Sequence, residues 1–181
     1  MPRVLILYGT SDGHTRAIAQ AIAEPLSLGG IGVDVIRAGT LEPILREYDA
    51  IIVAASVHAG RYQKAVERWV RAHAPEFGAR PTAFVSVSLA VLQHGDSKVT
   101  ADRDAIVKRF LEATAWQPGA IKHVAGALLY TRYNIFKRWI MKRIAAKAGG
   151  ETDTSHDYDY TDWADLRAFS QDFRRRLTAA A

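Results

Sequence analysis

Apolar runs and helical stripes alternate along the chain, and this alternation predicts the fold class. Val4–Tyr8 and Thr82–Ser88 have the pattern of strands, and Ala50–Ala55 is a continuous apolar run typical of a strand buried on both faces. Gly32–Ile36 and Ile121–Leu129 complete a set of five expected strands. We therefore expect an α/β fold, with three layers around a five-stranded parallel sheet and with residues 1–181 forming a single domain.

Between these runs, apolar residues recur every three or four positions, as on the buried face of a helix. Pro25 is expected to kink the first helix or end it early. Asp162 is expected to cap the last helix, with Asp165 reaching back from its first turn. The four stripes consist of Ala17, Ile18, Ala21, Ile22 and Leu26; of Val66, Trp69, Val70 and His73; of Ile106, Val107, Phe110 and Leu111; and of Leu166, Phe169, Phe173 and Leu177.

The segment between the first strand and the first helix favours phosphate binding. It reads Tyr8-Gly9-Thr10-Ser11-Asp12-Gly13-His14-Thr15, and a helix beginning near Thr15 would direct unpaired N–H groups and roughly +0.5 of charge at it. The segment has no Lys or Arg and matches neither G-x-x-x-x-G-K-[ST] nor G-x-G-x-x-G, which favours a phosphate monoester over a triphosphate. An ordinary capped strand-to-helix turn explains these eight residues alone equally well.

Two further loops follow the third and fourth expected strands, at the edge where parallel sheets bind ligands. They run from Ser56 to Tyr62 and from Ser86 to Gln93, and their small residues leave room for a flat ligand. A phosphorelay receiver would need acidic residues where this chain has Gly9-Thr10 and Ala55-Ser56. His58 has two interpretations, a residue that tunes or protonates a ligand and a solvated loop histidine.

Composition and charge narrow the class of protein. The chain has no cysteine, which excludes disulfides and thiolate metal sites, and no metal-ligand cluster stands out. No apolar run reaches the 18 or so residues of a membrane span, and the apolar stretch near Met1 is too short for a signal peptide. Residues 113–150 hold seven basic residues and no acidic one, against 17 basic and 19 acidic residues elsewhere. Such a localised charge favours one anionic partner and disfavours a nucleic-acid binder.

The basic residues lie mainly in an insertion before the last helix, at about residues 129–150. Aromatic, aliphatic and basic residues alternate in it with imperfect amphipathicity. One interpretation is a helix packed on the core with a solvated basic rim. The other is a surface for anionic lipid or for the two propionates of a porphyrin. The basic residues that would serve this second purpose are Arg132, Lys137, Arg138 and Lys142.

The first loop resembles the T/S-x-T/D-G-x-T pattern with which flavodoxins hold the phosphate of FMN. Over nearly its whole length, the chain resembles the flavodoxin-like, quinone-dependent protoporphyrinogen IX dehydrogenases of bacteria. The segments that carry this second resemblance are Thr10–Thr15; Ala55-Ser56 with Gly60 and Tyr62; Ser86-Val87 with Leu89; Ala125–Leu128 with Tyr130 and Arg132-Tyr133; Gly149–Thr154; and Tyr160–Trp163.

The resemblance implies FMN as cofactor and, in heme biosynthesis, the oxidation of protoporphyrinogen IX to protoporphyrin IX. Menaquinone or ubiquinone would take the electrons, and the protein would lie peripherally at the cytoplasmic face of the inner membrane. Backbone N–H groups between Ser56 and Gly60 would border the flavin N5 edge, and no side-chain acid or base is assigned. A homo-oligomer is left open. The implied FMN-binding residues are Thr10, Ser11, Asp12, Gly13, His14, Thr15, Ser56, Val57, His58, Gly60, Tyr62, Ser86, Val87, Ser88, Leu89, Ala90, Val91, Glu151 and Thr152.

Two alternatives remain from other functional classes. A flavodoxin-like electron carrier would dock on a reductase and have no small substrate, although such carriers are usually acidic. An NAD(P)H:quinone reductase would need a nicotinamide site, for which no signature is visible. Turnover of protoporphyrinogen with a quinone would separate the three.

Overall fold

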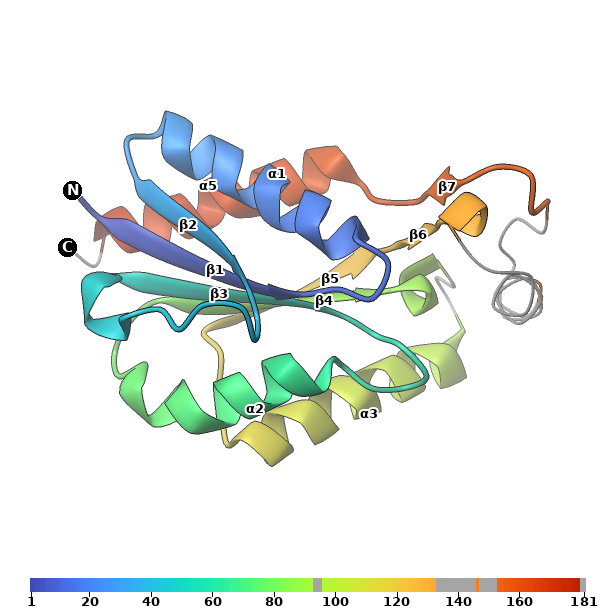
Figure 1. The fold of residues 1–181 in the computed structure, drawn as a ribbon, viewed down its shortest axis with the longest axis horizontal. Helices are drawn as coiled ribbons and strands as arrows, with labels where there is room; N and C mark the ends of the chain where they lie inside the picture. Colours follow the sequence, from blue (N-terminus) through green and yellow to red (C-terminus); the bar gives the residue numbers. More distant parts are fainter. Residues whose placement is uncertain (93–95, 133–145, 147–152, 180–181) are drawn as a thin grey trace.

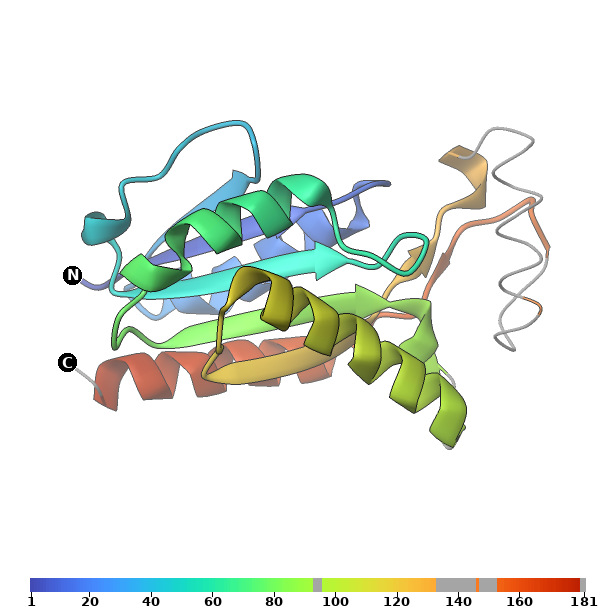
Figure 2. The ribbon, with the colours of Figure 1, turned by 90° about the horizontal axis from the view of Figure 1, so that it is seen from below.

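The computed structural model describes residues 1–92, 96–132, 146 and 153–179. In these residues a parallel sheet lies between two layers of helices, with α1 and α5 over one face and α2 and α3 over the other (Figure 1; Figure 2). The expected three-layer α/β fold is confirmed. The sheet strands are β1 (Arg3–Gly9), β2 (Gly32–Arg37), β3 (Ala50–Ser56), β4 (Thr82–Ser88) and β5 (Ala120–Ala125), and the helices are α1 (His14–Leu28), α2 (Lys64–His73), α3 (Ser97–Thr114) and α5 (Trp163–Ala179).

The strand order β2-β1-β3-β4-β5 places the ends of β1, β3 and β4 side by side. At this edge the register pairs Gly9 with Ala55, Ser56 with Val87, and Ser88 with Ala125. Because all five strands are parallel, the loops that follow them open at one edge of the sheet. The fold therefore brings together the three loops that the sequence singled out.

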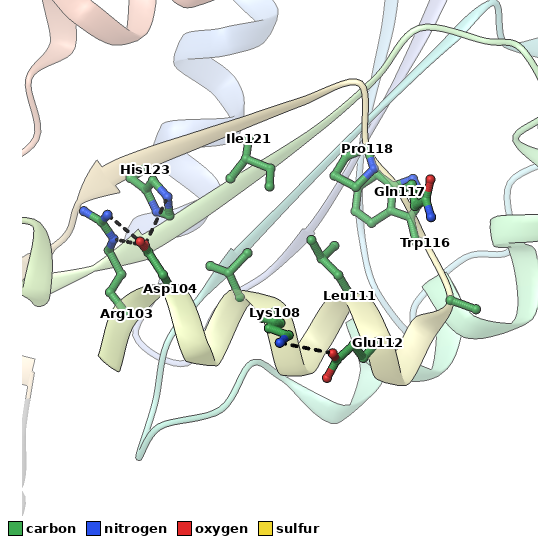
Figure 3. Close-up of a pocket in the computed structure, with 12 residues that line it drawn as sticks. Arg103, Asp104, Lys108, Leu111, Glu112, Trp116, Gln117, Pro118, Ile121 and His123 are labelled. Carbon is green, nitrogen blue, oxygen red and sulfur yellow. Dashed lines mark hydrogen bonds and ion pairs between the residues drawn. The ribbon is translucent and has the colours of Figure 1, made fainter. Parts of the chain in front are cut away.

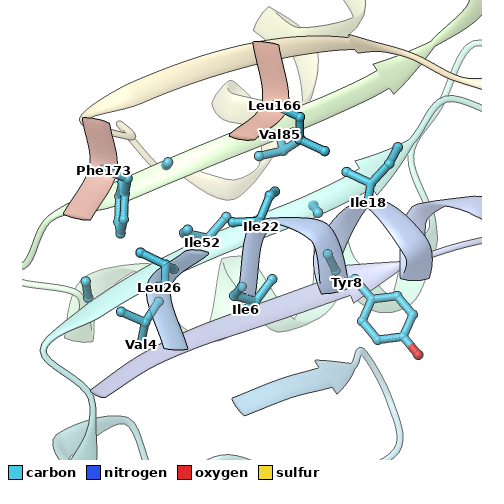
Figure 4. Close-up of a cluster of buried hydrophobic side chains, with 14 of the residues drawn as sticks. Val4, Ile6, Tyr8, Ile18, Ile22, Leu26, Ile52, Val85, Leu166 and Phe173 are labelled. Carbon is cyan, nitrogen blue, oxygen red and sulfur yellow. The ribbon is translucent and has the colours of Figure 1, made fainter. Parts of the chain in front are cut away.

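The inner strands β1, β3 and β4 bury side chains on both faces, whereas the edge strands β2 and β5 are only partly buried and include charged residues. Val4 and Ile6 point toward α1 and α5, whereas Leu5 points toward α2 and α3. Figure 4 shows the first of these clusters, in which Ile22 of α1 and Phe173 of α5 meet the sheet. The second cluster is richer in aromatic residues and contains Tyr62, Trp69, Phe77, Phe84, Phe110 and Trp116.

Of three local expectations, one was confirmed and two were wrong in detail. Pro25 does not end α1 early, because it lies in the last turn and its carbonyl accepts the N–H of the capping Gly29. Asp162 does cap α5, accepting the N–H of Asp165 at 2.9 Å. The Asp165 carboxylate, however, pairs with Lys122 of β5 at 2.5 Å instead of reaching back.

The expected strand over 121–129 is divided between β5 and β6 (Ala127–Leu128), which belongs to a second, two-stranded sheet. Its antiparallel partner is β7 (Tyr158–Asp159), where the chain returns before α5. Tyr130 is fully buried beside Tyr158. Residues 133–145 and 147–150 of the predicted insertion lie outside the described residues.

Candidate functional site

The three loops enclose one cleft at the carboxyl edge of the sheet, with Gly126 and Ala127 completing its wall. Its lining is rich in hydroxyl groups and contains no Lys or Arg among the described residues. The loop residues that line it are Thr10, Ser11, Asp12, His14 and Thr15 from the first loop; Ser56, Val57 and His58 from the second; and Val87, Ser88 and Leu89 from the third.

The first loop is shaped for an anion at a helix N-terminus. α1 begins at His14, and Gly13 before it adopts φ 95°, a left-handed conformation that glycine tolerates without strain. The Thr10 hydroxyl oxygen accepts the N–H of Gly13 at 2.8 Å and so closes the turn. Arg16 donates its N–H to the Gly13 carbonyl at 3.2 Å, whereas the N–H groups of His14 and Thr15 precede the first helical hydrogen bond and are available to an anion.

A second feature of the cleft also calls for a ligand. The side-chain oxygen of Ser88 is buried and has no hydrogen-bond partner among the described residues, although it lines the cleft. A buried hydroxyl without a partner is costly, and a ligand with polar atoms would satisfy it. Together with the first loop, Ser88 makes the donor set suitable for a phosphate monoester that carries a polar ring.

The second loop is a preformed turn. His58 donates its N–H to the Arg61 carbonyl at 2.7 Å, and Arg61 donates back to the His58 carbonyl at 3.1 Å. Between them Ala59 and Gly60 both have positive φ, as in a type I′ turn. Val57 donates its N–H to the Val87 carbonyl at 2.8 Å. Of the N–H groups from Ser56 to Gly60 that were expected to border the flavin N5 edge, those of Val57 and His58 are therefore used within the protein.

Tyr62 and Ser86 were expected in the site, but the structure places both behind it. The Tyr62 hydroxyl lies 2.7 Å from the Ser86 hydroxyl, and the Tyr62 ring packs edge-on against Phe84 and Phe110. Burial raises the pKa of Tyr62 to about 12, so the ring stays neutral. Neither residue lines the cleft, because inward-facing residues of the second loop and of β4 belong to the core.

The remaining predicted residues are distributed as follows. Ala90 and Val91 lie in the short 3₁₀ turn Leu89–Leu92 and do not line the cleft. Glu151 and Thr152 lie outside the described residues, as do Lys137, Arg138 and Lys142. Arg132 ends a short turn after β6, and its side chain is not among those described. The described residues hold no metal-binding group, and none of their helices is long and apolar enough to cross a bilayer.

His14 joins the first loop to the segment before α5. Thr161 donates its hydroxyl proton to the Ala125 carbonyl at 2.9 Å, so its oxygen accepts from His14 Nε2, 2.8 Å away. Asp159 lies 3.4 Å from the same nitrogen. Burial lowers the pKa of His14, and the Asp159 carboxylate opposes this only in part. The imidazole is therefore a neutral structural link at the wall of the cleft.

Sequence reasoning missed Gln63, which lies just before α2 and joins two of the loops. Its side-chain nitrogen lies 2.9 Å from the Ser56 hydroxyl and 3.2 Å from the Ser11 hydroxyl. The space for its amide exists because residue 9 is glycine, where a Cβ would lie 2.9 Å from the Gln63 oxygen and 2.4 Å from Val66 Cγ2. The sequence signal was a glutamine directly after a ligand loop, which is too common to single out.

A larger hollow of about 820 Å³ lies elsewhere, between α3 and the edge strand β5 (Figure 3). Aliphatic side chains and charged pairs such as Lys108–Glu112 line it, and it includes none of the three loops. The cleft between the loops measures only about 70 Å³. We nevertheless place the site in the cleft between the loops, because the N-terminus of α1, the hydroxyl groups and the unpartnered Ser88 hydroxyl converge on that cleft.

Comparisons with known proteins agree with this architecture. The family model for the flavodoxin domain matches residues 5–155. The chain is 36% identical over 171 residues to the protoporphyrinogen IX dehydrogenase (quinone) of Escherichia coli K12, covering 94% of this chain and 93% of that protein. It is 37% identical over 175 residues to the protein of that name from Leishmania major, covering 95% of this chain and 74% of the other.

Solved structures of flavodoxins share the fold at low sequence identity. The C101A mutant of the Pseudomonas aeruginosa flavodoxin has a TM-score of 0.59 and 14% identity, and the alignment covers 97% of this chain and 99% of that one. A flavodoxin from the domain Archaea has a TM-score of 0.55 and 13% identity, with 97% and 99% of the two chains covered. These neighbours extend over the sheet and both helical layers.

Proposed function

This chain belongs to the quinone-dependent protoporphyrinogen IX dehydrogenases of the flavodoxin domain family, and from that premise we propose that it oxidises protoporphyrinogen IX to protoporphyrin IX. The reaction removes six electrons, in three two-electron steps, and a quinone takes them up. FMN is the cofactor that the flavodoxin domain indicates. When bound, it supplies the two-electron chemistry that amino-acid side chains lack.

The single observation that carries this proposal is the hydroxyl-rich cleft at the N-terminus of α1, whose described lining residues include no Lys or Arg. Thr10, Ser11 and the first turn of α1 would hold the phosphate through neutral donors. Ser56 of the second loop and Ser88 of the third would meet polar atoms of the ring system. A site for a triphosphate would be expected to supply a basic side chain, as the lysine of a P-loop does, and the described lining lacks one.

The wall of the cleft suits a flat ligand more than acid–base catalysis. Its ionisable lining residues are Asp12, His14 and His58. The His14 imidazole is hydrogen-bonded to Thr161, which suits it to orient the loop. The protein would bind and orient the cofactor and the substrate and would exclude side reactions. Small residues at the loop tips would leave access for the macrocycle and then for the quinone.

Titration of the apo-protein with FMN tests the cofactor. Flavin fluorescence should be quenched on binding, and the complex should oxidise protoporphyrinogen IX with a quinone as acceptor. Quenching without turnover would favour a simple electron carrier. Reduction by NAD(P)H in place of protoporphyrinogen would favour a nicotinamide-dependent quinone reductase, and the absence of any flavin signal would remove the proposal altogether.

Kinetics test whether one site serves both substrates in turn. Because the loops form one cleft in the described chain, we expect ping-pong behaviour. Mixing the FMN-loaded protein with protoporphyrinogen alone in a stopped-flow instrument should bleach the yellow absorbance, and a second mixing with quinone should restore it. Bleaching that needs both substrates at once would contradict this order.

The same proposal includes peripheral binding at the cytoplasmic face of the inner membrane. Its support is the charge pattern, seven basic residues without an acidic one between positions 113 and 150. At about 1 kcal/mol for each basic residue near an anionic bilayer, such a segment gives reversible attachment. Membrane quinone and enzyme would then meet at the bilayer surface.

A further inference from the structure

Gln63 contacts the first and the second loop of the cleft with one functional group, its side-chain amide. Its Nε2 lies 2.9 Å from Ser56 Oγ and 3.2 Å from Ser11 Oγ, which allows one amide proton for each serine. Both serines line the cleft, whereas the Gln63 oxygen is buried away from it. The amide therefore contacts the two hydroxyls from outside the lining of the cleft.

The orientation of the amide follows from its surroundings. Its oxygen has no hydrogen-bond partner among the described residues, and it lies beside Gly9. The reversed amide would bury an NH₂ group, with two donors and no acceptor, in this same apolar position. Buried donors without partners are rarer in proteins than under-satisfied carbonyl oxygens, so the orientation with nitrogen toward the serines is favoured.

We propose that Gln63 is a positioning residue that turns the hydroxyl protons of Ser11 and Ser56 into the cleft. Each serine oxygen accepts a hydrogen bond from the amide, which leaves its own O–H free to donate toward the ligand. Ser11 then donates to the phosphate, and Ser56 donates to an acceptor atom on the ring system. This inference rests on the proposed binding of FMN.

A direct test is Gln63→Glu, which keeps the shape of the side chain and replaces its donors with acceptors. The ionised carboxylate would draw both serine protons away from the cleft. We expect the affinity for FMN to fall by at least about tenfold, since hydrogen bonds to a charged acceptor are among the strong ones. Riboflavin, which lacks the phosphate, should lose less, because only the Ser56 bond is affected.

The pH dependence shows whether the loss of FMN affinity comes from the orientation of the serine O–H groups or from altered packing. Lowering the pH toward 5 should partly restore FMN binding to the Gln63→Glu variant, since a protonated carboxyl donates again, and should not improve the wild type in the same way. Gln63→Leu removes donor and acceptor together and leaves the serines free to rotate, so its loss should be smaller. Gln171→Glu, an equal charge change at an exposed position of α5, is the matched control and should bind FMN normally.

Several outcomes would overturn the inference. Wild-type affinity for FMN in Gln63→Glu would show that the amide does not orient the serine O–H groups. Equal losses of affinity in the Glu and Leu variants at every pH would show the same. If Gln63→Glu does not fold, Gln63→Leu and Ser56→Ala should be combined, with a non-additive loss of FMN affinity expected and additivity contradicting the inference. Failure of the wild type to bind FMN would instead remove the proposed function itself, and this inference with it.

Discussion

At the scale of single residues, two buried serines differ in one respect that matters for binding. The Ser88 hydroxyl lines the cleft without a partner among the described residues, whereas the Ser170 hydroxyl donates to the Ile22 carbonyl at 2.6 Å. The first is available to a ligand, and the second joins α5 to α1. Equal substitutions at the two positions should therefore have opposite consequences for binding and stability.

Ser88→Ala should weaken FMN binding while leaving the free energy of unfolding of the apo-protein unchanged or slightly higher. Ser170→Ala should cost about 1 kcal/mol of stability, because the hydrogen bond that joins α5 to the Ile22 carbonyl of α1 is lost, and should leave FMN affinity intact. Urea unfolding and FMN titration of both variants check this pair. A Ser88→Ala protein that is destabilised yet binds FMN normally would show that Ser88 is a structural residue.

At the scale of elements, β1 and α2 pack so closely at Gly9 that no side chain fits between them. A methyl group on Gly9 would lie 2.4 Å from Val66 Cγ2, well inside van der Waals contact, and would press on Gln63. Gly9→Ala should therefore destabilise the protein by about 1–3 kcal/mol through overpacking. Adding Val66→Ala should recover part of this loss in chemical denaturation, and two simply additive penalties would contradict the steric explanation.

The link between α1 and the segment before α5 predicts a dependence on pH. Burial holds the pKa of His14 below its ordinary value of 6.5, so the unfolded chain takes up the proton first. The stabilisation is complete above pH 6.5 and is lost as the pH falls through the lower pKa of the folded state. Unfolding free energies between pH 8 and 5 should decline less in His14→Gln than in the wild type.

His58→Gln, in the exposed second loop, is the control for this experiment. Its slope of stability against pH is compared with those of the wild type and of His14→Gln. His123 also has a pKa lowered by burial, so some slope should remain in the His14 variant. A slope identical in all three proteins would exclude His14 as a proton-linked contact.

At the scale of the whole molecule, the uneven charge predicts a salt-sensitive association. Replacing Arg132, Lys137, Arg138 and Lys142 with Gln should leave FMN affinity intact while weakening co-sedimentation with anionic vesicles. Salt should act like the substitutions, since the Debye length falls from about 10 Å at 0.1 M to about 3 Å at 1 M. A raised KM for protoporphyrinogen in detergent would indicate that these residues recognise the substrate propionates instead. Wild-type behaviour in both assays would indicate that the segment has only a structural role.

How far the sequence predicted the molecule depends on the range of the interactions involved. Apolar runs located the sheet strands because burial leaves a local signal in the sequence. The first loop could be predicted because its glycine and hydroxyl residues directly precede the start of a helix. The burial of Tyr62 against Ser86 and the bridge made by Gln63 could not be predicted, because each depends on contacts between segments far apart in the chain or on a rotamer. The division of the expected fifth strand depends likewise on β7, some thirty residues later.

The packing of α5 beside α1 has a consequence for how the protein matures during synthesis. One face of the sheet is covered by both helices, yet α1 ends at Leu28 and α5 begins only at Trp163. At translation rates of about 5–20 residues per second, this face waits roughly 7–27 s for its second helix. Ile22 and its neighbours stay incompletely covered for that interval, so the nascent chain presents an apolar surface to chaperones until its last helix has left the ribosome.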